Sequence, residues 1–126
     1  MKFGYTIMYV ENIEETVAFY EKAFGLQRKF VHESGYGEMA TGETKLAFAN
    51  FDLAASNGLN FRKPDVQGPA PSIEIAFVTN DVEKDFLTAI SAGAVEVKRP
   101  MQKPWGQIIG YVRDLNGYLI EICSPV

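Results

Sequence analysis

The sequence has one cysteine and one histidine among its 126 residues, and each scarcity excludes a class of protein. The single cysteine, Cys123, excludes a disulfide framework and every zinc module that needs several cysteines. The single histidine, His32, excludes three-histidine metal sites and leaves one possible imidazole base. We interpret His32 as a surface residue at a strand edge and Cys123 as a small buried hydrophobe.

Long hydrophobic runs and an excess of positive charge are also missing. The most apolar stretches, residues 46–49 and 108–112, are strand-sized and far short of the ~20 residues of a membrane helix. The start of the chain has no apolar targeting segment, and the formal net charge is −4. Basic pairs are scattered, so neither nucleic acid nor a membrane is an expected partner, and we expect a cytoplasmic protein. A 47% hydrophobic and 22% charged composition is typical of one globular domain.

The sequence repeats a pattern of strand, polar cap and helix at an offset of 69 residues, since residues 5–21 and 74–90 both read this way. Asn12 and Asp81 fall at the same place in the two copies, where each is a favourable N-cap. Apolar residues at spacings of three and four follow each cap. We therefore predict two helices, which end at Gly25 and Gly93.

Three strand-like runs follow each helix. They are residues 26–32, 37–41 and 44–50, and then 94–98, 107–113 and 118–123. Glycine and proline are concentrated in residues 52–71, which is typical of a connector. The sequence thus predicts an α+β fold of two βαβββ modules, residues 1–51 and 72–126, in a single domain. Because one helix covers only one face of a four-stranded sheet, we expect the curved sheets to pair around a cleft.

Several local motifs make this organisation specific. The opening strand 5–10 is followed by Ala18-Phe19-Tyr20 and then by Phe24-Gly25-Leu26, and the chain closes with residues 112–121, Val-Arg-Asp-Leu-Asn-Gly-Tyr-Leu-Ile-Glu. With two βαβββ modules, these motifs resemble the vicinal oxygen chelate superfamily. That superfamily includes glyoxalase I, bleomycin and fosfomycin resistance proteins, and extradiol dioxygenases.

The resemblance implies one divalent ion held by the first and last strands of the two modules. Carried over by register, its ligand positions are Tyr5, about Ala47, Glu74 and Glu121. Relatives that bind a metal usually have histidine at the first and third of these positions, and this sequence has none there. The resemblance also implies activity like that of a lactoylglutathione lyase, or of another metal-assisted lyase, isomerase or dioxygenase, acting on a small molecule.

Two glutamates are the strongest functional candidates. Strand alternation places Glu74 with Ala76 and Val78, opposite the larger apolar side chains that a helix covers. By the same reasoning Glu121 lies opposite Ile120 and Ile122. We therefore expect Glu74 and Glu121 to face the cleft as candidate catalytic residues.

Three interpretations of this pair stay open. The glutamates form a hydrogen-bonded polar pair without further function, or they bind a hard cation such as Mg²⁺ or Mn²⁺, with Ni²⁺ also considered. In the third interpretation no metal is bound. The glutamates then anchor a cationic or aromatic drug-like ligand, or one of them is a general base whose pKa is raised by burial.

Other side chains are candidates for the walls of the ligand site. Trp105 lies between Pro104 and Gly106, where it either caps the cleft or covers a sheet end or a dimer contact. For the remaining candidates, core packing is nearly as good an explanation. The expected ligand-binding residues are Tyr5, Phe48, Trp105, Tyr111 and Arg113. The resemblance also implies a homodimer.

Overall fold

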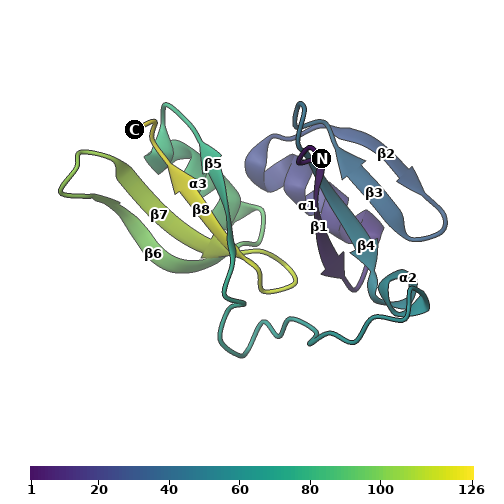
Figure 1. The fold of residues 1–126 in the computed structure, drawn as a ribbon. Helices are drawn as coiled ribbons and strands as arrows, with labels where there is room; N and C mark the ends of the chain where they lie inside the picture. The colour runs from purple at the N-terminus through teal and green to yellow at the C-terminus, as the bar shows by residue number, and fades with distance from the viewer. The chain divides into compact units, whose positions relative to one another are not determined.

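The computed structural model describes residues 1–126, which form eight strands and three helices in two compact units. One unit comprises residues 1–21 and 25–63, and the other comprises residues 22–24 and 64–126. The elements are β1 (Tyr5–Val10), α1 (Ile13–Phe24), β2 (Arg28–His32), β3 (Tyr36–Met39), β4 (Lys45–Asn50), α2 (Phe51–Ser56), β5 (Glu74–Val78), α3 (Val82–Ser91), β6 (Val95–Gln102), β7 (Ile108–Arg113) and β8 (Leu119–Cys123). This order confirms the predicted α+β fold of two βαβββ modules (Figure 1).

The first module is a four-stranded sheet in the order β1-β4-β3-β2. β1 and β4 are parallel, and the other neighbours are antiparallel. Helix α1 covers one face of the sheet. The contact is close at Gly37 of β3, where an added Cβ would lie 3.3 Å from Ile13 and 3.4 Å from Val17. Tyr20 of α1 packs against Phe48 of β4, with the two rings tilted and their centroids 4.8 Å apart. Hydrophobic burial between helix and sheet therefore supplies the core of this module.

Helix α1 has the boundaries that its sequence predicts. The Asn12 side chain accepts a hydrogen bond of 2.9 Å from the Glu15 backbone N–H, which satisfies one of the free donors at the helix start. At the other end Gly25 adopts the left-handed conformation with φ 67°, and its N–H donates to the Glu21 carbonyl.

The predicted connector contains a short helix, α2, that no pattern in the sequence indicates. Asn50 caps α2 by accepting a hydrogen bond of 2.8 Å from Leu53 N–H. Asn50 is the last residue of β4, so no turn residues separate the strand from the helix. The remaining part of the connector, residues 57–73, contains no helix or strand.

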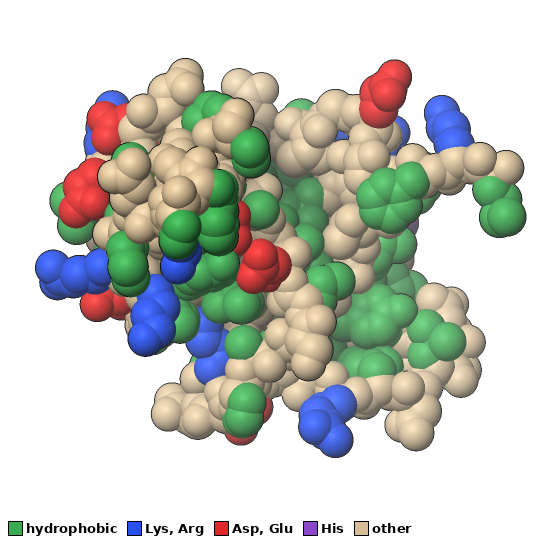
Figure 2. Space-filling view, turned by 60° about the vertical axis from the view of Figure 1, so that its left-hand side comes forward, with side chains coloured by type: hydrophobic (Ala, Val, Ile, Leu, Met, Phe, Trp, Pro, Cys, Tyr) green, Lys and Arg blue, Asp and Glu red, His purple; other side chains and the backbone are tan.

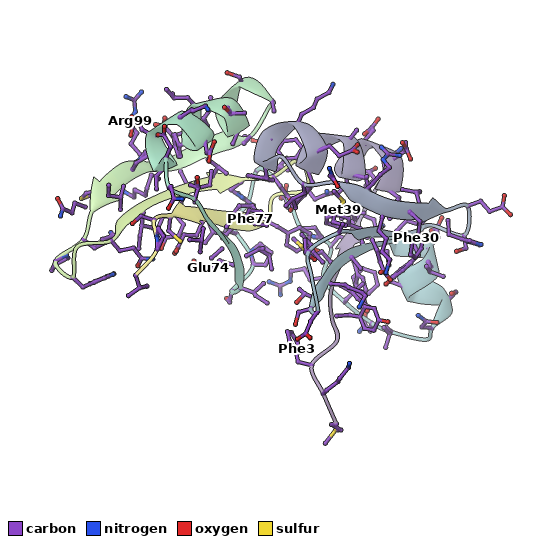
Figure 3. The ribbon with its side chains drawn as sticks, turned by 90° about the horizontal axis from the view of Figure 1, so that it is seen from above. Phe3, Phe30, Met39, Glu74, Phe77 and Arg99 are labelled. Carbon is purple, nitrogen blue, oxygen red and sulfur yellow. The ribbon has the colours of Figure 1, made fainter.

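The second module has the same topology, with strand order β5-β8-β7-β6 and β5 parallel to β8. Helix α3 begins after Asp81, whose side chain accepts from Lys84 N–H at 3.2 Å. It packs on one face of the sheet, where a Cβ at Gly110 would come within 3.0 Å of Phe86. Neither α1 nor α3 covers the other face of its sheet, and we call this face the open face (Figure 3).

The turn between β7 and β8 is organised by a buried carboxylate. One oxygen of Asp114, a residue with 1% exposure, accepts from the backbone N–H groups of Asn116 and Tyr118 at 2.9 and 2.8 Å. Gly117 completes the turn with φ 95°, a conformation that other residues rarely adopt. Asn116-Gly117 is a favourable hairpin sequence, and the hairpin that it forms fixes the register of β8.

No helix in residues 1–126 is long and apolar enough to cross a membrane. Hydrophobic side chains reach the surface in several places on the face shown in Figure 2, with acidic and basic side chains between them.

Candidate functional site

The open face of the second module is ordered in rows by strand register. Paired residues of β7, β8 and β5 lie side by side on one face of the sheet. The three rows are Arg113–Leu119–Glu74, Tyr111–Glu121–Ala76 and Ile109–Cys123–Val78. The register therefore confirms that Glu74 and Glu121 share a face, and that Ile75, Phe77, Ile120 and Ile122 belong to the opposite one.

The two glutamates and a tyrosine form a hydrogen-bonded cluster. Glu121 on the central strand β8 is only 9% exposed. The Tyr111 hydroxyl donates to its Oε2 atom at 2.9 Å. The Glu74 carboxyl lies close enough to Glu121 for the two groups to interact directly. Because two carboxylates offer only acceptors, a hydrogen bond between them needs a proton on one of them. We call Glu74, Glu121 and Tyr111 the carboxyl cluster.

The pKa values of Glu74, Tyr111 and the neighbouring Cys123 are all raised. Loss of hydration, the hydrogen bond to Glu121 and the charge of that group raise the pKa of Glu74. The same causes raise the pKa of Tyr111 to about 12, so its phenol stays protonated and donates. Burial and the neighbouring Glu121 raise the pKa of Cys123 to about 11, which keeps the thiol protonated and unreactive.

The donor set of the cluster does not fit a resident divalent ion. Mg²⁺ and Mn²⁺ favour several oxygen ligands, and Ni²⁺ is well served by imidazole. The open face of this module offers only two carboxyl groups, and one of them already accepts from the Tyr111 hydroxyl. No group of three or more His, Cys, Asp or Glu side chains among residues 1–126 is placed to hold a metal ion. The chemistry of this cluster is that of two neighbouring carboxyl groups beside a phenol.

The first module carries a second tyrosine–glutamate pair, which the sequence analysis missed. Glu38 of β3 is 6% exposed, and its Oε2 accepts from the Tyr36 hydroxyl at 3.0 Å. Its other oxygen lies 3.8 Å from Lys29 Nζ. Burial and the bond to Glu38 raise the pKa of Tyr36 to about 12. The signal available in the sequence was the alternation Tyr36-Gly37-Glu38, which puts both polar side chains on one face of a strand.

Two of the predicted ligand positions in the first module carry no charged donor. Register pairs Ala47 with Ile7 on one side and with Glu38 on the other, so the carboxylate stands one strand away from the position expected from the resemblance. Tyr5 is exposed at the start of β1 on the same open face, and its ring lies 5.6 Å from Lys45 Nζ. His32 is exposed as predicted, and its Nδ1 accepts from the Ser34 N–H at 3.1 Å.

The structure corrects the expectation for Phe48 and separates Trp105 from the cluster. Phe48 is completely buried on the face covered by α1, against Tyr20, and is a core residue without access to a ligand. Trp105 lies at the turn between β6 and β7, is 64% exposed, and donates to Gln107 Oε1 at 3.0 Å. It belongs to a different end of the sheet from the row that contains Glu74, because β7 begins near Trp105 and ends at Arg113.

Arg113 shares the open face, but its guanidinium is committed to the protein backbone. Its Nε donates to the Gly117 carbonyl at 2.8 Å, and its two terminal nitrogens donate to carbonyls of residues 65–68. The expected role of Arg113 as a direct ligand contact is therefore replaced by one in holding the chain. Of the predicted site residues, the structure brings together Glu74, Glu121 and Tyr111.

Comparison with solved structures agrees with this fold. The structure resembles a glyoxalase-related enzyme from Fulvimarina pelagi with a TM-score of 0.85 and 19% identity, covering 98% of this chain and 88% of that one. It resembles a glyoxalase/bleomycin resistance protein/dioxygenase family enzyme from Burkholderia phytofirmans with a TM-score of 0.81 and 17% identity over 100% of both chains. TioX from Micromonospora sp. ML1 gives a TM-score of 0.75 and 19% identity, again over 100% of both chains.

No curated protein matches the sequence. The family model of the Glyoxalase/Bleomycin resistance protein/Dioxygenase superfamily matches residues 2–122, which is nearly the whole sequence. Together with the two βαβββ modules, this match establishes that the chain belongs to the glyoxalase/bleomycin resistance protein/dioxygenase superfamily.

Proposed function

We propose that this protein binds a small organic amine through the carboxyl cluster on the open face of its second module. The observation that supports the proposal is the placement of Glu74 and Glu121 on one face of the sheet, with the Tyr111 hydroxyl donating to Glu121. A buried carboxylate is costly unless it is paired, and here its partners are a second carboxyl, a phenol and a thiol. None of these partners is a cation, so the cluster still attracts positive charge.

The chemistry of the cluster favours an ammonium group over a neutral ligand. An ammonium ion donates up to three hydrogen bonds, which the oxygens of the two carboxyl groups accept. Its positive charge stabilises the ionised form of Glu74, whose pKa is raised in the free protein. Binding therefore releases protons to the solvent in the pH range where Glu74 is partly protonated. Apolar neighbours on the same face, Ala76 and Val78 of β5, offer contact to the organic part of the ligand.

The proposal is tested by calorimetric titration with benzylamine, a small aromatic amine, in two buffers of different ionisation enthalpy. We expect saturable binding whose heat differs between the buffers because a proton is released. Glu121→Gln and Glu74→Gln should each weaken binding by about tenfold or more, as for loss of a buried charge partner. Glu96→Gln is the matched control, since Glu96 is exposed on β6 and pairs with Arg99 at 3.3 Å.

Two outcomes contradict the proposal. Binding of benzylamine that is unchanged in both Glu74→Gln and Glu121→Gln places the ligand elsewhere. A rise in thermal stability with Mg²⁺, Mn²⁺ or Ni²⁺ that disappears in Glu121→Gln makes the cluster a cation site, because a ligand that binds only the folded state stabilises it.

A further inference from the structure

A segment of the connector, residues 65–68, is fastened to the second module by a single side chain. Arg113 Nη2 donates to the Asp65 carbonyl at 2.9 Å, and Nη1 donates to the carbonyls of Gly68 at 2.5 Å and Val66 at 3.3 Å. Its Nε is bonded to Gly117 in the turn between β7 and β8. One rigid guanidinium thus joins two segments that lie more than 40 residues apart in the sequence.

Hydrogen bonds within residues 65–68 give the segment a turn conformation. Asp65 closes it into a turn, since its side chain accepts from Gln67 N–H at 2.9 Å and its carbonyl accepts from Gly68 N–H at 3.1 Å. The turn rests directly on Gly117, where an added Cβ would lie 3.1 Å from Val66 Cα. Only glycine permits this approach of two backbones. We call residues 65–68 the strap.

The strand register locates the strap relative to the carboxyl cluster. Arg113 is the last residue of β7, and Leu119 and Glu74 are the first residues of β8 and β5. The three form one row at the same end of the sheet, with Arg113 and Glu74 about 10 Å apart at the usual strand spacing. The strap therefore lies at the end of the open face where Glu74 stands, and the face continues toward Cys123 at the other end.

We propose that Arg113 is a positioning residue that holds the strap as a fixed border of the ligand face and thereby limits the size of the ligands that reach Glu74. The inference deepens the proposed function and names its specificity determinant. On this proposal a ligand centred on the carboxyl cluster extends toward the exposed Val78 and meets the strap beyond Glu74. Lysine at position 113 keeps the charge, but one ammonium group cannot bond four carbonyls in this fork geometry.

The test uses Arg113→Lys, with Arg99→Lys as the matched control. Arg99 is an arginine of β6 whose side chain is 83% exposed and bonded only to the exposed Glu96. Hydrogen exchange should be about tenfold faster at the Gln67 and Gly68 amides of Arg113→Lys, the change expected when local opening becomes easier by one hydrogen bond. Arg99→Lys should leave both amides unchanged.

The second readout is the size selectivity of Glu74, measured by covalent labelling. Carbodiimide activates the protonated carboxyl of Glu74, which then forms an amide with either glycinamide or the bulkier tryptamine, and mass spectrometry quantifies the two products. In Arg113→Lys the ratio of tryptamine to glycinamide product should rise about threefold or more, because a loosened border no longer excludes the larger amine. Asp65→Ala, which removes the Asp65 side-chain bond on an exposed loop, should raise the ratio in the same direction.

The outcomes separate the two proposals. If hydrogen exchange at Gln67 and Gly68 is unchanged in Arg113→Lys, Arg113 does not hold the strap in place. If exchange is faster but the product ratio is unchanged in both Arg113→Lys and Asp65→Ala, the strap does not limit the size of the ligand. Failure of the wild-type protein to bind benzylamine overturns the proposed function alone, since the product ratio still measures access to Glu74.

Discussion

Replacing Tyr111 by phenylalanine removes one hydroxyl and with it one donor to the buried Glu121. The bond is 2.9 Å long, and its acceptor is 9% exposed. Hydrogen bonds to charged groups contribute about 1.5–3 kcal/mol to stability, but Tyr111 is half-buried and water can replace part of the lost bond. We therefore expect Tyr111→Phe to lower the free energy of unfolding by about 1–2 kcal/mol, measured by urea denaturation at pH 7.

A double-mutant cycle with Glu121→Leu isolates the bond from other effects of the substitution. In the Glu121→Leu background the acceptor is gone, so Tyr111→Phe should change stability by less than about 0.5 kcal/mol. Tyr5→Phe, on the exposed start of β1, is the control and should also stay within about 0.5 kcal/mol of the wild type. An equal cost of Tyr111→Phe in both backgrounds would refute the hydrogen bond as the source of the effect.

Three further predictions follow from burial and ionisation. The pKa of Glu74 is raised in the folded state, so the wild type loses stability as the pH rises from the ordinary glutamate pKa through the raised one. Glu74→Gln should therefore gain stability relative to the wild type between pH 4 and pH 7.5. A difference in urea midpoint between the two proteins that is equal at both pH values contradicts this. Phe48→Ala should cost about 3–5 kcal/mol, whereas the exposed Trp105→Ala should cost less than about 0.5, by the same urea assay. Cys123, 2% exposed with its pKa raised to about 11, should react with a disulfide reagent at pH 8 only as fast as the protein unfolds, and rapid labelling of the native protein argues against its burial.

The sequence predicts most of the fold because its local signals are strong and mutually consistent. Asn12 and Asp81 cap helices α1 and α3, and Gly25 ends the first helix as its position predicts. Helix α3 ends one residue earlier than Gly93 predicts, because Ala92 is its C-cap, and Gly93 follows with φ 112°. Helix α2 was not predicted, because its six residues are too few to show helical periodicity.

The site is harder to predict because its chemistry depends on which side chains meet across strands. Alternation placed Glu74 and Glu121 on one face, but only the register shows that Tyr111 reaches Glu121. Phe48 was a wall candidate because an aromatic residue on a strand fits either face equally well. Arg113 resembles a ligand-binding cation in the sequence, and nothing local reveals that its partners are carbonyls more than 40 residues away.

Although the two modules share a topology, the position of the buried glutamate in one module does not predict its position in the other. In the second module the glutamate is on the central strand β8 and its tyrosine is on β7. In the first module the corresponding central position is Ala47, and Glu38 and Tyr36 lie together on β3. Both modules thus bury a glutamate beside a tyrosine hydroxyl on an open face, but different strands supply the groups. The buried pair can therefore be built from either strand, provided that register brings a phenol to the carboxylate, and sequence position alone does not fix which strand carries the charge.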